Sequence, residues 1–172
     1  MSQPVQYPPL PKAVESHDDI DTIRAVLEAN TKPIEATNEA LVAHVPFSDA
    51  LAAVLARAHQ DGALVRGLDG AERTLRNEAK GMAKADQKSG AVRKARISRL
   101  LLLSGDGSKR FYRDASFLLK HHHDRLLVLK LDTDESTLGR AVFNGDQQAR
   151  AMLVVQKAAV VSTLVALANH FS

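Results

Sequence analysis

Four consecutive leucines, Leu100 to Leu103, place the strongest restriction on what this chain can fold into. By its position and length the segment Ile97 to Leu103 is a strand, and the turn-forming residues SGDGS follow it at 104–108. A strand that is apolar at every position is typical of parallel or mixed sheets, whose two faces are both covered. A second such run, LLVLKLD at 126–132, follows after a helix-length segment. The sequence therefore predicts a sheet buried between two helical layers.

The remaining pattern alternates helices with strands. Ser48 is a good N-cap for a helix that ends near Gly62, and Leu64 and Val65 form a very short strand behind it. Further predicted elements are a helix capped by Asp69 and running through Arg76, a helix with Phe111, Ala115, Leu118 and Leu119 inward, a short helix at 134–143, a strand at 151–156 and a tail helix at 157–171. This order predicts an α/β fold, a three-layer α/β/α sandwich with a small mixed sheet. We place this domain at residues 47–172, with a C-terminal helix.

Residues 1–46 are predicted to be an N-terminal helical extension that packs on the domain or on a neighbour. Pro4, Pro8, Pro9 and Pro11 favour an extended arm. Ile20, Ile23, Val26 and Leu27 then fall on one face of a short amphipathic helix, and Pro33 comes after its end.

Composition narrows the class of protein. The 172 residues carry a net charge of +3 and no cysteine, so thiolate metal sites and cysteine nucleophiles are excluded. The longest apolar region, from Ala151, is broken by Gln156 and Lys157 and is not a clean membrane span. The first residues lack the pattern of a secretory or transit leader, so we expect a cytoplasmic or nuclear protein.

Basic residues gather in the middle of the chain, which favours a polyanionic partner. From Arg73 to Arg99 there are nine cations against Glu78 and Asp86. The small and polar residues at about 77–96 resemble an inserted loop that becomes ordered on RNA, and the alternative is a solvated loop without a ligand. Aromatic residues are few nearby, Phe111 and Tyr112 only, so recognition of folded RNA by its backbone is favoured over stacking on single strands.

The order of elements over residues 48–155 resembles the kink-turn-binding ribosomal protein superfamily. The similar segments are DALAAVLARAHQDGALVRGLDGAERTLR, LLLLSGDGS and LLVLKLDTDESTLGRAV. In that family a basic residue and a glycine open the RNA-facing helix, and Arg66, Gly67 and Arg73 stand in register with them. The resemblance implies an RNA face that a turn at Leu138, Gly139 and Arg140 completes.

One departure refines what the resemblance implies. Members that grip a kink-turn carry an Asn-Glu pair after the glycine, whereas this chain has Leu68, Asp69 and Gly70 before Glu72. An Asp cannot donate the hydrogen bonds of an Asn amide. The closest pattern is therefore that of the eukaryotic small-subunit ribosomal branch, which also lacks this Asn.

These observations predict a non-enzymatic RNA-binding subunit of a ribonucleoprotein, with no cofactor and no metal. A ribosomal protein bound to folded rRNA is the first expectation, in the cytoplasm, with neighbouring proteins held by the two terminal extensions. The predicted RNA-binding residues are Arg66, Gly67, Arg73, Arg76, Lys80, Lys84, Lys88, Arg93, Lys94, Arg96, Gly139 and Arg140. The alternatives are a nucleolar or RNA-processing particle of the same superfamily, a mitochondrial ribosome, and a protein-interaction module without RNA.

Three enzyme readings are weaker. SGDGSKR lacks the Gly-Lys-Ser/Thr order of a phosphate-binding loop, and Ser108 serves better as a helix cap. His121, His122 and His123 are consecutive, so on a helix their side chains diverge and cannot easily share one metal ion. Asp106, Asp132 and Asp134 follow strands without a matching base or nucleophile, as caps and turn residues do.

Overall fold

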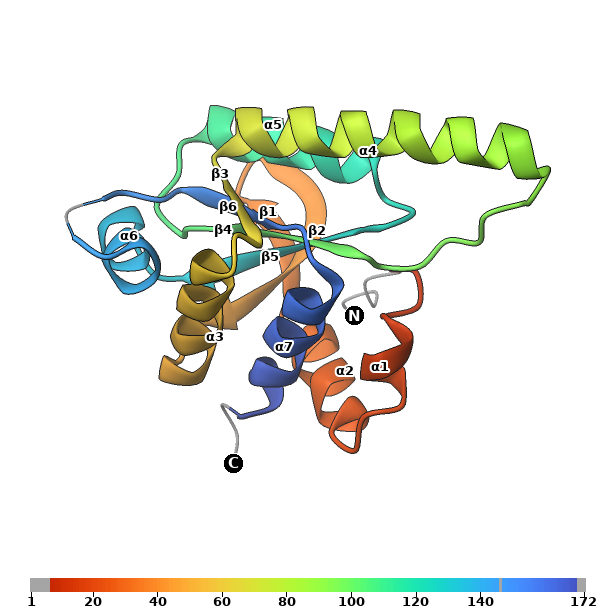
Figure 1. The fold of residues 1–172 in the computed structure, drawn as a ribbon. Coiled ribbons are helices and arrows are strands. Elements are labelled where there is room, and N and C mark those ends of the chain that lie inside the picture. The colour runs from red at the N-terminus through yellow and green to blue at the C-terminus, as the bar shows by residue number, and fades with distance from the viewer. Residues whose placement is uncertain (1–6, 146, 170–172) are drawn as a thin grey trace.

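The fold is an α/β sandwich around one six-stranded mixed sheet (Figure 1). The structure is a computed structural model that describes residues 7–145 and 147–169. Pro4 and Phe171, part of the predicted arm and tail helix, lie outside the described residues. In chain order the elements are α1 (Lys12–Glu15), α2 (Ile20–Ala29), β1 (Thr31–Glu35), β2 (Asn38–Pro46), α3 (Asp49–Gln60), β3 (Leu64–Arg66), α4 (Leu68–Ser89), β4 (Arg99–Leu103), α5 (Lys109–His121), β5 (Leu126–Asp132), α6 (Glu135–Phe143), β6 (Ala151–Val154) and α7 (Lys157–Ala168).

The two leucine-rich strands form the centre of the sheet. The strand order is β1-β2-β5-β4-β6-β3, and β4 pairs in parallel with β5 from Arg99 opposite Leu126 to Leu103 opposite Lys130. Strand β2 is also parallel to β5, whereas β6 is antiparallel to β4 and to β3. Burial of Leu100 to Leu103 is complete, which confirms that both faces of this strand are covered.

Two hydrophobic cores lie on opposite faces of the sheet. Leu101 and Leu103 belong to the core under α4 and α5, whereas Leu100 and Leu102 belong to the core formed with α2, α3, α6 and α7. Figure 1 shows α4 and α5 above the sheet and α1, α2, α3 and α7 below it. The predicted three-layer arrangement is confirmed.

Residues 31–46 are part of the sheet rather than an appended extension. Strands β1 and β2 pair as an antiparallel hairpin, and β2 continues the sheet from Ala43 opposite Leu129 to Pro46 opposite Asp132. Pro33, expected to mark the end of the preceding helix, lies in the edge strand β1 instead. An edge strand tolerates proline because one row of its backbone donors needs no partner.

Helix α4 replaces most of the predicted loop at 77–96. It runs for 22 residues, and Gly90 ends it in the left-handed conformation with φ +69°. Apart from Gly70 and Gly81 the segment is rich in Ala, Glu, Lys, Arg, Gln and Met, which are good helix formers. The loop prediction was therefore wrong up to Ser89, and only residues 90–98 connect the helix to β4 without regular structure.

Side chains cap several of the helices. Ser48, Ser108 and Asp134 accept hydrogen bonds from the backbone N–H groups of Leu51, Phe111 and Thr137. These bonds confirm Ser48 and Ser108 as caps. Asp69 was expected to cap α4, but the helix begins one residue before it, after Gly67.

A buried tyrosine holds the turn between β4 and α5. The Tyr112 hydroxyl donates to the Ser104 carbonyl at 2.7 Å and accepts from the Gly107 N–H at 3.0 Å. Tyr112 is 2% exposed, so it takes the inward place that was predicted for Phe111.

Candidate nucleic-acid interface

Five of the predicted RNA-binding residues form one stripe along α4. Consecutive helical residues are about 100° apart, so these side chains fall within an arc of about 120°. At about 1.5 Å per residue the stripe is about 22 Å long. All five side chains are exposed, and the buried residues of α4, Ala71 and Leu75, lie on the opposite side of the helix. We call this set the α4 stripe; its members are Arg73, Arg76, Lys80, Lys84 and Lys88.

The α4 stripe is largely available to a ligand. Arg76 lies 3.5 Å from Glu72, one turn earlier, and both side chains are more than half exposed. Such a pair is weak in water and exchanges readily for a contact with phosphate. The other four cations have no ion-pair partner among the described residues. A row of unpaired charges on a rigid helix suits a polyanion.

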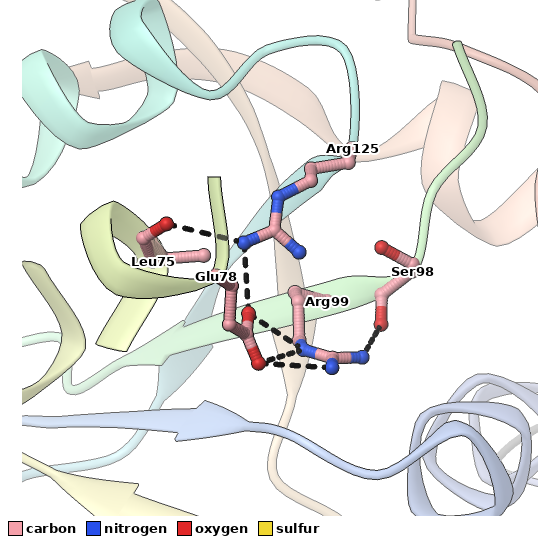
Figure 2. A network of polar contacts seen from close by, with 5 residues as sticks. All are labelled: Leu75, Glu78, Ser98, Arg99 and Arg125. Carbon is pink, nitrogen blue, oxygen red and sulfur yellow. Dashed lines mark hydrogen bonds and ion pairs between the residues drawn. The ribbon is translucent and has the colours of Figure 1, made fainter. Parts of the chain in front are cut away.

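A partly buried ionic cluster fixes the orientation of α4 (Figure 2). The carboxylate of Glu78 accepts hydrogen bonds from Arg99 Nε and Nη2 at 3.0–3.2 Å and from Arg125 Nη2 at 2.8 Å. Burial alone would raise the pKa of Glu78, but these hydrogen bonds and the two positive charges outweigh it and hold the pKa below its usual value. The cluster joins the middle of α4 to β4 and to the residue before β5, so the stripe is held outward.

Arg66 and Gly67 lie where α4 begins. Gly67 has φ +84°, a conformation that favours glycine, and its N–H donates to the Ala151 carbonyl at 2.8 Å. Arg66 donates to Gln147 Oε1 at 2.6 Å and to the Gln148 carbonyl, and its guanidinium lies 5.2 Å from the centre of the Phe143 ring. The structure thus brings Arg66 and Gly67 to the same end of α4 as Arg73, with Arg66 already engaged inside the protein.

The residues after α4 do not extend the stripe. Arg93 pairs with Asp86 at 3.0 Å, and Arg96 donates to the Leu10 carbonyl at 2.5 Å. Lys94 is exposed. Arg99, counted among the phosphate-seeking cations from the sequence, is bound by Glu78 instead. The density of charges along the sequence could not reveal that Arg99 is neutralised, because Arg99 and Glu78 are 21 positions apart.

Leu138 and Gly139 lie inside α6 and not in a turn. Both residues are buried, and a Cβ atom on Gly139 would overlap the Gln147 carbonyl. The prediction that this turn completes the RNA face was therefore wrong for Leu138 and Gly139. Arg140 is exposed on α6. The short helix predicted at 134–143 is present, and the Asp134 cap starts it.

A groove lies between α4 and α5, where the sequence had indicated no site. Its volume is about 750 Å³, and Arg76, Lys80, Phe117, His121 and His122 are among its lining residues. Phe117 is 51% exposed. Burial, followed by the charge of Arg125, lowers the pKa of His122. Phe117 falls between the inward positions of α5, so the helical pattern already indicated that this ring faces out.

In residues 7–145 and 147–169 no group of three or more His, Asp or Glu side chains is arranged to hold a metal ion. Within that same part of the chain no helix has both the length and the apolar character needed to cross a bilayer.

Comparison with known proteins gives a structural likeness but no family. No protein-family model matches the chain, and no curated protein does. Among solved structures the chain is similar to a protein with unknown function from Bacillus halodurans C, with 18% identity and a TM-score of 0.42. The match covers 71% of this chain and 99% of that protein.

Proposed function

We propose that this protein is a non-enzymatic RNA-binding subunit of a ribonucleoprotein and that it binds folded RNA through the α4 stripe. The observation that carries the proposal is the row of exposed cations from Arg73 to Lys88 on one face of a single helix. The resemblance of the sequence to the kink-turn-binding ribosomal proteins supports RNA as the polyanion and a ribosomal particle as the first setting.

The chemistry of the stripe favours contact with the phosphate backbone over reading of bases. Lysine and arginine bind phosphate through charge and hydrogen bonds, and such contacts orient a protein without selecting a sequence. Phe117 in the adjoining groove offers one exposed ring beside Arg76 and Lys80. One ring can stack on a single unpaired base but cannot form a platform for a strand.

Salt dependence gives the proposal a magnitude. If all five cations meet phosphates of a duplex, the logarithm of the binding constant falls with the logarithm of salt with a slope of about −4.5. Between about 50 and 200 mM salt the affinity then falls by about 500-fold. We expect the double variant Lys80→Ala/Lys84→Ala to reduce the magnitude of this slope by about 2.

The test is fluorescence anisotropy with a structured ribosomal RNA fragment over a series of potassium chloride concentrations. The matched control is Lys32→Ala/Arg57→Ala, which also removes two exposed cations but on β1 and α3, away from α4. Equal slopes for the two double variants would refute the assigned face. Sequencing of the RNA that crosslinks to the protein in cell extract then distinguishes a ribosomal role from a role in an RNA-processing particle. If no RNA is recovered, a protein-interaction module is the better explanation.

A further inference from the structure

A second cationic feature lies beneath the far end of α4. Figure 1 shows α4 continuing beyond the sheet and the connection to β4 returning below it, toward α1. A partly open cavity of about 420 Å³ lies there, lined by this connection, by Met82 of α4, by Pro11 and by the start of α7. Met82 lies on the side of α4 opposite the α4 stripe, so the cavity and the stripe are separate surfaces.

Seven basic side chains line this cavity. The connection and the first residue of β4 contribute Arg93, Lys94, Arg96 and Arg99. The starts of α1 and α7 contribute Lys12 and Lys157, and the seventh is Arg125.

The positive charge is only partly balanced. Asp124 is the one acidic side chain among the described residues of the lining, and Glu78 and Asp86 pair with three of the arginines. Seven cations against these three carboxylates leave an excess of four positive charges. Lys12, Lys94 and Lys157 have no ion-pair partner among the residues that the structure describes.

Arg125 is a buried cation whose hydrogen bonding is incomplete. Its side chain is 8% exposed, and its Nη2 atom donates to Glu78. Its Nε atom is buried and has no partner. A buried guanidinium N–H that lacks an acceptor is unfavourable.

The walls of the cavity are held in place without a ligand. The N–H of Arg96 donates to the Asp124 carbonyl at 3.0 Å, and the N–H of Ile97 donates to the Pro9 carbonyl at 2.8 Å. Met82, Ile97 and Val160 supply an apolar part of the lining. A preformed cavity of this size with a few converging polar groups is typical of small-molecule sites.

We propose that this cavity binds a small molecule that carries two or three linked phosphates, whose remaining part lies against the apolar residues. The excess of four positive charges matches the charge of such a group, and arginine forks bind phosphate through paired hydrogen bonds. The site does not depend on RNA binding, because it faces the other side of α4.

Calorimetric titration of the full chain with inorganic tripolyphosphate and with ATP tests the proposal. We expect saturable binding of both probes, weakened about tenfold or more by Lys94→Ala/Lys157→Ala, since each lysine contributes a charge-assisted contact. If ATP binds more tightly than tripolyphosphate, the apolar residues of the cavity contact its base. If the two affinities are equal, the phosphates alone account for binding. Either result supports the site. Lys32→Ala/Arg57→Ala is the control, and we expect it to change affinity by no more than about twofold because these exposed charges lie on β1 and α3, outside the cavity and the α4 stripe.

A second measurement reports on the buried arginine itself. The N–H at Nε of Arg125 is sheltered from solvent and gives a side-chain resonance in proton–nitrogen correlation spectra, which we expect to shift at saturating tripolyphosphate. No saturable heat would overturn the proposal. An Arg125 resonance that stays in place, or equal weakening by the two double variants, would do so as well, because binding would then be attraction to general positive charge.

Discussion

Replacing Glu78 by glutamine should destabilise the fold more than any change of an exposed acid on the same helix. The glutamine keeps the size of the side chain but removes the charge that Arg99 and Arg125 share. Its amide nitrogen would also meet a guanidinium donor, so one of the present hydrogen bonds is replaced by a repulsive contact. Arg125 then remains as a buried cation without a counterion.

The expected loss follows from the burial of the three side chains. Removing one partner of a buried pair costs about 3–5 kcal/mol. The side chain of Glu78 is 26% exposed, so water offsets part of that loss. We therefore expect a decrease of about 3 kcal/mol in the free energy of unfolding, which lowers Tm by about 6–12 °C in a chain of this size.

Urea unfolding followed by circular dichroism measures this difference, with Glu72→Gln as the matched control. Glu72 pairs with Arg76 on the exposed side of α4, and its loss should change stability by no more than about 0.5 kcal/mol. A loss below about 1 kcal/mol for Glu78→Gln, or equal losses for the two variants, would refute a stabilising role for the cluster.

The same cluster predicts a dependence on pH. The pKa of Glu78 is lowered in the folded state, so the folded protein binds its proton less readily than the unfolded chain does. Its stabilisation is complete above the unfolded pKa of about 4.3 and is lost as the pH falls through the lowered folded value. The stability of wild-type protein should therefore fall more steeply with acid than that of Glu78→Gln.

Four further substitutions have defined outcomes. Gly139→Ala should lower Tm because the added Cβ would overlap the Gln147 carbonyl. Gly81→Ala, in an open helical position, should instead raise the free energy of unfolding by up to about 1 kcal/mol. Thermal melts of the two variants compare these effects. Tyr112→Phe leaves two backbone groups without their partner and should cost about 1–3 kcal/mol in urea unfolding. Burial lowers the pKa of His44, so wild-type stability should decrease as the pH falls below about 6.5, and His44→Gln should flatten that decrease in the same assay.

Strands β3 to β6 and most helices were predictable because their signals are local. Runs such as Leu100 to Leu103 indicate a covered strand without any knowledge of the partner. Ser48 and Ser108 mark helix starts through hydrogen bonds that reach only three residues along the chain. These elements were placed correctly.

The errors concern features decided by distant contacts or by competing local signals. Glycine and small polar residues near Gly81 suggested a loop, whereas the helix is set by good helix formers on either side and is anchored by Glu78. The hairpin at 31–46 was not predicted, because Pro33 was interpreted as the end of a helix. A proline is compatible with a strand only at the edge of a sheet, and the sequence did not show that this segment lies there. The cavity under α4 is lined by residues as far apart in the sequence as Lys12 and Lys157, so no local sequence pattern could predict it.

The two outer strands of the sheet determine how this protein can meet other molecules. On one side β1 carries Pro33 and an irregular register before Glu35, and on the other side β3 is only three residues long. Neither border offers a regular row of free donors and acceptors to a foreign strand, so growth of the sheet from chain to chain is disfavoured. Recognition by strand addition is therefore disfavoured as well, and the helical surfaces are the better places for partners to dock.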